Sequence, residues 1–340
     1  MAESLAVKYR PKTFDDVTEQ ESVKIILQQQ ISNDEIQHAY LFIGGAGTGK
    51  TTCARIFANA INKGHGNPLE LDGASNNSVD DVRNIIQQAK VQSMDSEYRV
   101  FILDEVHAFS NNAWQAMLKL LEEPPKKSIF IMCTTDPQKI PRTIISRVQK
   151  FTFKRISQDG ICKRLEWILG QEIKLTRTYE SQAIQYIAKI ADGGMRDAIT
   201  LLDKCLAYSP DLTIENVIEA LGTVDYEVFF ELSDAIHTKQ SDNMIKVIES
   251  VHNNGKDLKQ FIKDYVSFLL DINKYDILHN FDYLQLPITY AETLQNYEQG
   301  WYDTCRNLLP TVVKLNADIK WETQPKIAIE ARLLEEVLKC

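Results

Sequence analysis

A run of eight residues near the start of the chain has the spacing of a phosphate-binding loop. It fits the pattern G-x-x-x-x-G-K-[ST] and consists of Gly44, Gly45, Ala46, Gly47, Thr48, Gly49, Lys50 and Thr51. Glycines let the main chain wrap around anionic oxygens, and the amides of the following helix point toward them. In this pattern the lysine neutralises the β- and γ-phosphates and the threonine hydroxyl binds Mg²⁺. We therefore predict that these residues, with Thr52, bind a nucleoside triphosphate.

A second motif places two carboxylates at the end of another apolar run. Val100–Leu103 is followed directly by Asp104 and Glu105. Such a run suits a central parallel strand that is buried on both faces and meets its ligand at the carboxyl end. Asp104 would hold Mg²⁺, directly or through water, and Glu105 would orient and polarise the water that attacks the γ-phosphate. Taken alone, Asp104 and Glu105 could be ordinary acids at the end of a strand, and the glycine-rich run could be an ordinary turn. Taken together, the two motifs predict an NTP hydrolase.

The elements that must position these motifs alternate between strand and helix over the first 155 residues. Apolar runs predict strands at Ala39–Ile43, Leu69–Asp72, Val100–Asp104, Ile129–Thr134 and Val148–Phe153. Apolar residues at helical spacing predict helices at Ser22–Ile31, Lys50–Asn62, Val79–Val91 and Ala113–Leu121, with Ser78 and Asn112 as N-caps. This alternation predicts an α/β P-loop domain, in which a parallel sheet carries helices on both faces.

The remainder of the chain is predicted to be helical. Residues 156–223 have helical patterns at Ile161–Leu169, Tyr179–Ala191, Met195–Leu206 and Ile214–Leu221. From residue 224 onward there is no strand pattern, and an all-α bundle is predicted from amphipathic helices at Val228–Ile236, Asp242–Val251, Leu258–Leu278, Trp301–Leu315 and Lys326–Leu338. We therefore expect three domains, at 1–155, 156–223 and 224–340.

Composition narrows the class of protein. The 340 residues hold no apolar stretch long enough to span a membrane and no N-terminal export signal, so we expect neither. The six cysteines are scattered without a C-x-x-C pair, as suits thiols in a reducing cytoplasm. The net charge of −9 is uneven, since Lys139–Arg155 has six basic residues and no acid. Charge therefore neither requires nucleic acid as a partner nor excludes it.

Four further stretches resemble the AAA+ clamp-loader ATPases, in particular the bacterial DNA polymerase III gamma/tau family. They are Val7–Phe14 (VKYRPKTF), Asp72–Asn77 (DGASNN), Leu120–Pro125 (LLEEPP) and Thr134–Pro141 (TTDPQKIP). The similarity is strong over residues 1–223 and beyond them rests on length and helicity alone. It implies an AAA+ ATPase domain that binds ATP, then a small helical lid and an all-α collar domain through which subunits oligomerise.

The resemblance implies roles for single residues. Arg147 matches the arginine of a Ser-Arg element, which reaches the γ-phosphate bound by the neighbouring subunit; alternatively it is one charge of the basic run. Thr135 falls at the sensor-1 position near the attacking water, or else caps a strand end. Arg196 matches the sensor-2 arginine that reads the γ-phosphate from the lid, with a plain surface charge as the alternative. The adenine side of the nucleotide would be lined by Tyr9, Arg10 and Pro11.

The resemblance also implies contacts with DNA and with a clamp. This family meets DNA mainly at phosphates, through helix N-termini and a few polar side chains. The candidates are Asn76, Asn77, Ser78 and Arg83 at one helix start and Ser110, Asn111 and Asn112 at another. Ordinary helix capping explains these polar residues equally well. Met94, in a polar turn, is the candidate for contact with the clamp, with a core methionine as the alternative.

Two departures from the family pattern bear on the site. The family usually inserts a four-cysteine zinc module after the P-loop helix, whereas this chain has only Lys63–Pro68 there. One histidine and no cysteine cannot form a tetrahedral structural zinc site, so we predict no zinc. Val148 follows the Ser-Arg element where the family has cysteine, which leaves the role of the arginine intact.

These features predict an ATP-driven motor subunit of a sliding-clamp loader, with ATP and Mg²⁺ as ligands. The expected partners are the sliding clamp, primed-template DNA and other loader subunits in a ring or spiral, expected to be pentameric. One alternative is a different AAA+ motor, such as a helicase loader or a branch-migration motor. The other is a nucleotide-binding scaffold without turnover, against which the intact Lys50, Asp104, Glu105 and Arg147 argue.

Overall fold

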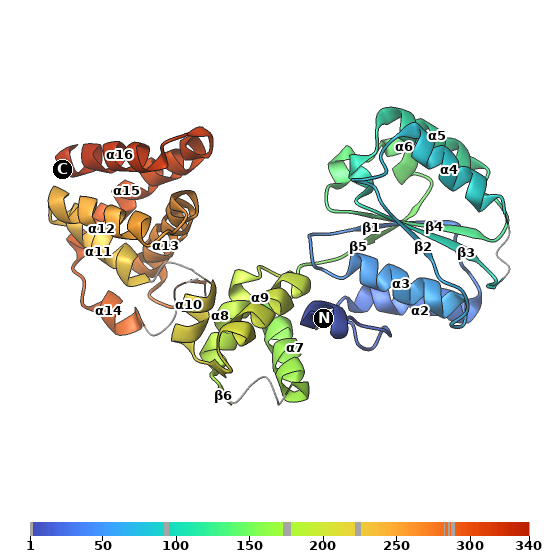
Figure 1. Cartoon of the computed structure of the whole chain (residues 1–340), viewed down its shortest axis with the longest axis horizontal. Coiled ribbons are helices and arrows are strands. Elements are labelled where there is room, and N and C mark those ends of the chain that lie inside the picture. Colours follow the sequence, from blue (N-terminus) through green and yellow to red (C-terminus); the bar gives the residue numbers. More distant parts are fainter. Residues whose placement is uncertain are drawn as a thin grey trace. The chain divides into compact units, whose positions relative to one another are not determined.

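The computed structural model describes residues 3–91, 95–172, 178–221, 226–281, 283, 284, 286 and 290–339. The chain divides into two compact units, Met1–Pro210 and Asp211–Cys340 (Figure 1). Across the described ranges, every helix is too short or too polar to cross a lipid bilayer.

A five-stranded parallel sheet forms the centre of the first unit. Its order is β2-β3-β4-β1-β5, and the strands are β1 Ala39–Ile43, β2 Leu69–Asp72, β3 Arg99–Asp104, β4 Ser128–Thr134 and β5 Gln149–Thr152. Every residue of β1 and β4 is buried, as expected for apolar runs that have a helix layer on each side. The predicted parallel sheet is confirmed.

Helices cover both faces of this sheet (Figure 1). Side chains alternate along β1, so Tyr40 and Phe42 pack into one layer and Leu41 into the other. The first layer consists of α2 Glu21–Asn33 and α3 Lys50–Ile61, and the second of α4 Val79–Ala89, α5 Asn111–Glu122 and α6 Arg142–Ile145. Short 3-10 turns follow the ends of β3 and β4, namely η1 Val106–Ala108 and η2 Pro137–Lys139.

Two helix starts in the second layer test the predicted N-caps. Ser78 caps α4 and forms a capping box with Asp81, as predicted. At α5 the prediction of Asn112 as the cap is wrong, because Ser110 accepts the hydrogen bond from a first-turn amide at 3.2 Å. Ser110 has the extended backbone that an N-cap needs (φ −66°, ψ 159°), whereas Asn112 already lies within the helix.

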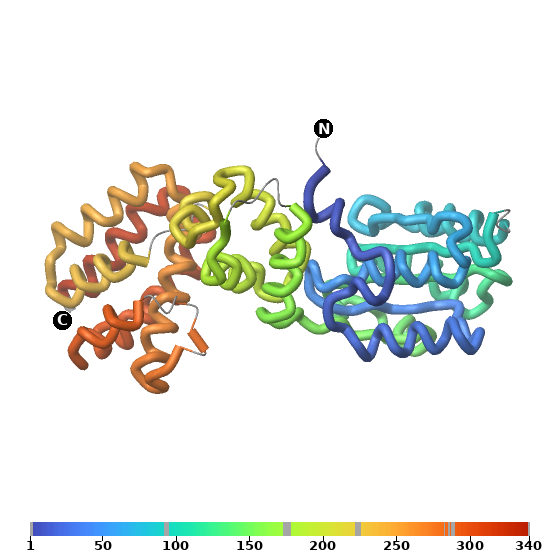
Figure 2. The backbone as a smooth tube through the Cα atoms, turned by 90° about the horizontal axis from the view of Figure 1, so that it is seen from below, coloured from blue at the N-terminus to red at the C-terminus, as the bar shows by residue number. Residues whose placement is uncertain are grey.

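Three longer helices and a short N-terminal helix complete the first unit. The longer ones are α7 Gln158–Gln171, α8 Ser181–Ile190 and α9 Met195–Tyr208. The predicted start of α8 at Tyr179 is too early, since Thr178–Tyr179 is a short strand, β6. The N-terminal helix α1 Leu5–Lys8 packs against α9 (Figures 1 and 2). There Leu5 N donates to Asp203 Oδ2 at 3.2 Å, which attaches the N-terminal arm to the helical part of the unit.

The second unit is built from helices, with the two-residue strand β7 Asp211–Leu212 at its start. The helices are α10 Ile214–Leu221, α11 Tyr226–His237, α12 Ser241–Asn253, α13 Leu258–Leu278, α14 Ala291–Gln295, α15 Gln299–Asp318, η4 Ile319–Trp321 and α16 Pro325–Lys339. The short helix α14 was not predicted, because five residues are too few to show a helical period. The predicted all-α region is confirmed.

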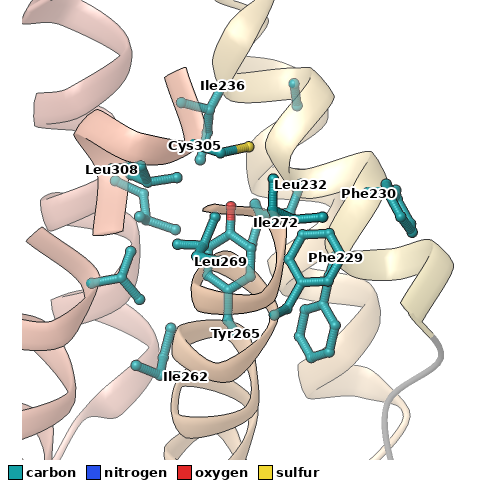
Figure 3. Close-up of a cluster of buried hydrophobic side chains, with 14 of the residues drawn as sticks. Phe229, Phe230, Leu232, Ile236, Ile262, Tyr265, Leu269, Ile272, Cys305 and Leu308 are labelled. Carbon is teal, nitrogen blue, oxygen red and sulfur yellow. The ribbon is translucent and has the colours of Figure 1, made fainter. Parts of the chain in front are cut away.

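This unit has its own core, in which aromatic rings pack among aliphatic side chains (Figure 3). Phe229 of α11 stacks on Tyr265 of α13 with ring centroids 5.6 Å apart. The Tyr265 hydroxyl is buried with the ring and shares a hydrogen bond of 2.9 Å with Ser233 Oγ. Burial raises the pKa of Tyr265 well above its ordinary value. The hydroxyl therefore stays protonated and paired, as a buried polar group must.

Candidate active site

The phosphate-binding loop joins the carboxyl end of β1 to the start of α3. Gly47 and Gly49 have φ angles of +68° and +100°, a region that glycine enters without steric cost. The Lys50 side chain is buried in the loop, where its Nζ donates to the carbonyl oxygens of Gly44 at 2.9 Å and Gly45 at 2.8 Å. The first amides of a helix have no partner within it. Together with the buried ammonium, they make this loop a fitting place for phosphate oxygens.

Close approach of other segments explains two of the loop glycines. A Cβ on Gly44 would lie 2.7 Å from Phe153 O. A Cβ on Gly47 would lie 3.0 Å from Gly194 Cα, and Gly47 O accepts a hydrogen bond of 3.0 Å from Met195 N. The loop is therefore packed directly against the start of α9, the helix that carries Arg196.

Thr51 and Asp104 bring a hydroxyl and a carboxylate together beside the loop. Thr51 Oγ1 donates to Asp104 Oδ2 at 2.6 Å, and Asp104 Oδ1 accepts from Glu105 N at 3.0 Å. Hydroxyl and carboxylate oxygens are the ligands that Mg²⁺ uses beside a bound nucleotide. The donor set therefore fits Mg²⁺, and that Thr51 and Asp104 hold the ion stays a prediction.

Glu105 is held by two neighbouring side chains. Its φ of +47° lies in the left-handed region, which is costly for a residue with a Cβ and recurs at functional sites. Thr135 Oγ1 donates to Glu105 Oε2 at 3.0 Å, and His107 Nδ1 lies 3.1 Å from the same oxygen. His107 Nδ1 also lies 3.3 Å from Thr134 Oγ1, at the end of β4. Both side-chain contacts are therefore made to the same carboxylate oxygen, Oε2.

One cleft of about 350 Å³ collects most of the predicted nucleotide-binding residues. Gly44 and Gly45 lie outside its lining. The predicted residues that do line it are Tyr9, Arg10, Pro11, Ala46, Gly47, Thr48, Gly49, Lys50, Thr51, Thr52, Asp104, Glu105 and Arg196. The cleft therefore joins the N-terminal arm, the phosphate-binding loop, the end of β3 and the start of α9.

The N-terminal arm, which contributes Tyr9, Arg10 and Pro11 to the lining of the cleft, is held by contacts with α7. Arg164 Nη2 donates to Tyr9 O at 2.9 Å, and its guanidinium lies 4.3 Å from the ring centroid of Trp167. Burial lowers the pKa of Arg164. The Tyr9 hydroxyl donates to Glu172 Oε1 at 2.7 Å, and Lys8 pairs with the same carboxylate. Hydrogen bonds from Lys8 and then Tyr9 hold the pKa of Glu172 below its ordinary value.

Arg147 lies at the edge of the sheet where the parallel strands begin, whereas the cleft of its own chain lies at the edge where they end. It precedes β5, whose first residue pairs with the second residue of β1, whereas Lys50 follows the end of β1. A strand rises about 3.3 Å per residue, so the five residues of β1 separate the two edges by roughly 16 Å. Arg147 Nη2 pairs with Glu122 Oε1 at 2.9 Å. Arg147 thus does not serve the nucleotide of its own chain, and its action on a neighbour stays a prediction.

The two helix starts predicted to meet DNA phosphates adjoin each other. Ser110 N, before α5, donates to Asn77 O, before α4, at 3.1 Å. Asn76 is partly buried and donates to Asp72 O at 2.9 Å. The exposed candidates are Asn77, Ser78, Arg83, Ser110, Asn111 and Asn112, of which Arg83 pairs with Asp80 at 2.8 Å. Contact with DNA stays a prediction for all seven.

Two further predictions are not tested by the structure. Met94, the candidate for contact with the clamp, lies outside the described residues. Lys63–Pro68, the segment that stands where a zinc module is usual, connects α3 to β2. That this chain takes no zinc remains a prediction.

Sequence analysis missed two groups at the site. His107 contacts Glu105, and its place two residues after that glutamate could have suggested the contact. Arg164 and Glu172 hold the N-terminal arm from 155 and 163 positions away. Local spacing carries no signal for contacts over such separations.

Several known proteins and protein families are similar to this chain in sequence. The sequence model described as DNA polymerase III, delta subunit, matches residues 19–78 and 71–157. The model described as DNA polymerase III clamp loader subunit, ATPase lid domain, matches residues 160–211. The DNA polymerase III subunit tau of Bacillus subtilis is 34% identical over 96% of this chain, which spans 62% of that protein.

One structural similarity identifies the fold of this chain, and one further sequence similarity identifies its family. The RuvB Holliday junction branch migration motor of Thermotoga maritima has a similar structure, with a TM-score of 0.53 over 73% of this chain and 86% of that one. At 17% identity this likeness shows the fold alone, a P-loop AAA+ architecture. The DNA polymerase III subunit gamma of Buchnera aphidicola is 32% identical over 98% of both chains. This chain therefore belongs to the DNA polymerase III gamma/tau family of clamp-loader subunits.

Proposed function

We propose that this chain is an ATP-driven motor subunit of a sliding-clamp loader. The observation that carries the proposal is the single cleft in which Lys50, the Thr51–Asp104 pair and Glu105 meet. A complete hydrolytic set of this kind favours turnover over nucleotide binding alone. Membership of the clamp-loader family favours a sliding clamp as the protein on which the motor acts. The chain spans 62% of the Bacillus subtilis tau subunit and 54% of that from Salmonella typhimurium, so this function is our inference for the sequence in hand.

In the proposed reaction, a water oxygen attacks the γ-phosphorus and the bond to the β–γ bridging oxygen breaks, giving ADP and phosphate. Glu105 orients the water and accepts its hydrogen bond, while Thr135 holds the carboxylate in place. Lys50 and the loop amides stabilise negative charge on the phosphates. Mg²⁺, held by Thr51 and Asp104, would neutralise charge between the phosphates. Arg196 would read the γ-phosphate from the lid.

The proposed finger, Arg147, acts on the nucleotide of the next subunit. An arginine supplied in trans stabilises transition-state charge and is worth about 10³–10⁵ in rate. An isolated subunit is then a poor ATPase. Residues 1–155 serve as the ATPase domain and 156–223 as the lid, while 224–340 form a collar that holds a pentamer of loader subunits together. The proposed setting is the cytoplasm, with the sliding clamp and primed-template DNA as the other partners.

The main alternative is a different AAA+ motor, because the fold is shared with a branch-migration motor. A nucleotide-binding scaffold is the second alternative, although the intact catalytic set argues against it. Steady-state ATP hydrolysis by the full chain, alone and with a cognate sliding clamp plus primed-template DNA, separates the three. Stimulation that needs both clamp and DNA supports the loader. Turnover that ignores the clamp indicates another motor, and nucleotide binding without turnover indicates the scaffold.

A mixing experiment tests the finger. Lys50→Ala and Arg147→Ala should each lose hydrolysis, while Arg142→Ala, an exposed arginine on α6, should keep it. Mixing the two inactive variants should restore activity wherever an Arg147→Ala chain binds ATP next to a Lys50→Ala chain with an intact finger. If chains of this protein adjoin in the assembly and the mixture stays inactive, Arg147 does not act in trans.

A further inference from the structure

Gln20 ties down the connection between the sheet and α7. The connection is residues 153–157, which leave the end of β5 and enter α7. Gln20 is buried, its Nε2 donates to Lys154 O at 2.7 Å, and its Oε1 accepts from Lys154 N at 3.1 Å. Its Nε2 also lies 3.4 Å from Thr48 O in the phosphate-binding loop. One side-chain amide thus holds both main-chain groups of Lys154 and adjoins the phosphate-binding loop.

Glu19 holds the same connection three residues further on. Its carboxylate accepts from Ser157 N at 3.2 and 3.3 Å and from the Ser157 hydroxyl. Ser157 is the N-cap of α7, so the negative charge lies at the favourable, positive end of that helix. A Cβ on Gly160 would lie 2.5 Å from Glu19 Oε1. In its observed position this carboxylate therefore occupies space that a side chain at residue 160 would need.

The backbone at both residues is strained. Glu19 and Gln20 have φ angles of +56° and +59°, in the left-handed region that side chains with a Cβ disfavour. Such conformations persist where the surrounding contacts over-determine them, and they concentrate at ligand clamps. Thr18, which precedes Glu19, and Ile156, which precedes Ser157, both line the cleft. Thr48, whose carbonyl oxygen adjoins Gln20, lines it as well. The strained pair thus lies next to residues that line the cleft.

We propose that the side chains of Glu19 and Gln20, together with Lys154 and Ser157, form a clasp. This clasp fixes the start of the lid beside the nucleotide cleft. The inference rests on the proposed binding of ATP. The clasp holds α7, and α7 carries Arg164, which holds the N-terminal arm at Tyr9. Glu19 and Gln20 are therefore positioning residues that set nucleotide affinity without touching the nucleotide.

The test is the Kd of the full chain for ADP, with KM and kcat for ATP measured under loading conditions. Glu19→Ala, Glu19→Gly and Gln20→Ala should each raise Kd about tenfold, because each loses buried or charge-assisted hydrogen bonds. Their kcat at saturating ATP should match the wild type, since Glu105 and its partners are unchanged. Glu19→Gln keeps an acceptor oxygen for Ser157 N and should retain most of the affinity.

Two features make the test decisive. Glycine adopts a positive φ without strain, so Glu19→Gly stays folded and reports the lost carboxylate rather than a distorted backbone. Glu21→Gln is the matched control, because Glu21 is the next acid along, is 70% exposed at its side chain and pairs with Lys24. Wild-type Kd in Glu19→Gly and Gln20→Ala, at unchanged Tm, overturns the clasp. A wild-type chain that binds no ADP instead overturns the proposed function on which the clasp rests.

Discussion

At the scale of single residues, Glu105 depends on the groups that hold it. Its left-handed backbone and its two contacts at Oε2 give the carboxylate one orientation. Thr135 supplies one of these contacts with a hydroxyl, 3.0 Å away. In the role that we propose for Glu105, a carboxylate works only from the right position relative to its water, so the holding groups should matter to rate more than to affinity.

We expect Thr135→Val to lower kcat about tenfold to a hundredfold, the range over which misplacing a catalytic group acts. Valine has the shape of threonine without the hydroxyl, so it removes the hydrogen bond and leaves the packing. Thr135→Ser keeps the hydroxyl and should stay within about threefold of the wild type, which is within the scatter of such effects. Steady-state ATP hydrolysis with clamp and DNA measures kcat, and ADP titration should show unchanged binding for both variants. Equal kcat for the valine and serine variants would contradict the role of the hydroxyl.

Some of these residues can be predicted from the sequence and others cannot. Lys50, Thr51, Asp104 and Glu105 belong to local patterns in which spacing and chemistry are linked. Glu19 and Gln20 gave no such signal, because a left-handed backbone at residues other than glycine follows from tertiary contacts and not from local preference.

At the scale of elements, the central strands β1, β3 and β4 were predictable because burial on both faces requires unbroken apolar runs. The edge strands β2 and β5 are largely exposed, so their apolar signal is weaker. The helix starts were harder, because several small polar residues in a row can each serve as a cap. At α5 the run Ser110, Asn111 and Asn112 offers three candidates, and the structure selects the first.

Truncation of each candidate should reproduce this choice. Ser110→Ala should destabilise the start of α5 by about 1 kcal/mol, the usual value of an N-cap, because one first-turn amide loses its acceptor. Asn112 is the second residue of the helix. Asn112→Ala should therefore leave the start of the helix unchanged or slightly more stable, since alanine is the better helix former. Amide hydrogen exchange of the first turn of α5 measures both. Faster exchange in Asn112→Ala than in Ser110→Ala would show that the cap is assigned to the wrong residue.

At the scale of the whole molecule, stability should depend on pH in the alkaline range. Burial raises the pKa of Cys53 from 9.0 to about 12 and that of Tyr40 from 10.0 to about 12. Above pH 9 the unfolded chain therefore releases the Cys53 proton while the folded chain keeps it. The unfolded state then binds fewer protons, so the free energy of unfolding falls as pH rises from about 9 to about 12.

Each such group contributes a slope of about 1.4 kcal/mol per pH unit within its window. Cys53→Ala removes one titrating group, so its stability should fall less steeply with pH than that of the wild type, whatever the cost of the cavity. Urea denaturation followed by circular dichroism between pH 9 and 11 gives the two slopes. Parallel slopes would mean that the Cys53 thiol does not titrate as its burial requires.

The position of Arg147 bears on how many complete ATPase sites an assembly of these chains can contain. Because Arg147 and Lys50 lie at opposite edges of one sheet, the finger that we propose and the nucleotide site that would receive it lie at unlike ends of that sheet. Contacts between unlike ends join chains head to tail, and such a series either closes on itself or has free termini. With the finger acting in trans, a series with free termini has one complete site fewer than it has chains, whereas a closed series has as many sites as chains. The phosphate released per chain in a single rapid turnover, measured by quench-flow, therefore reports whether the assembly has a gap.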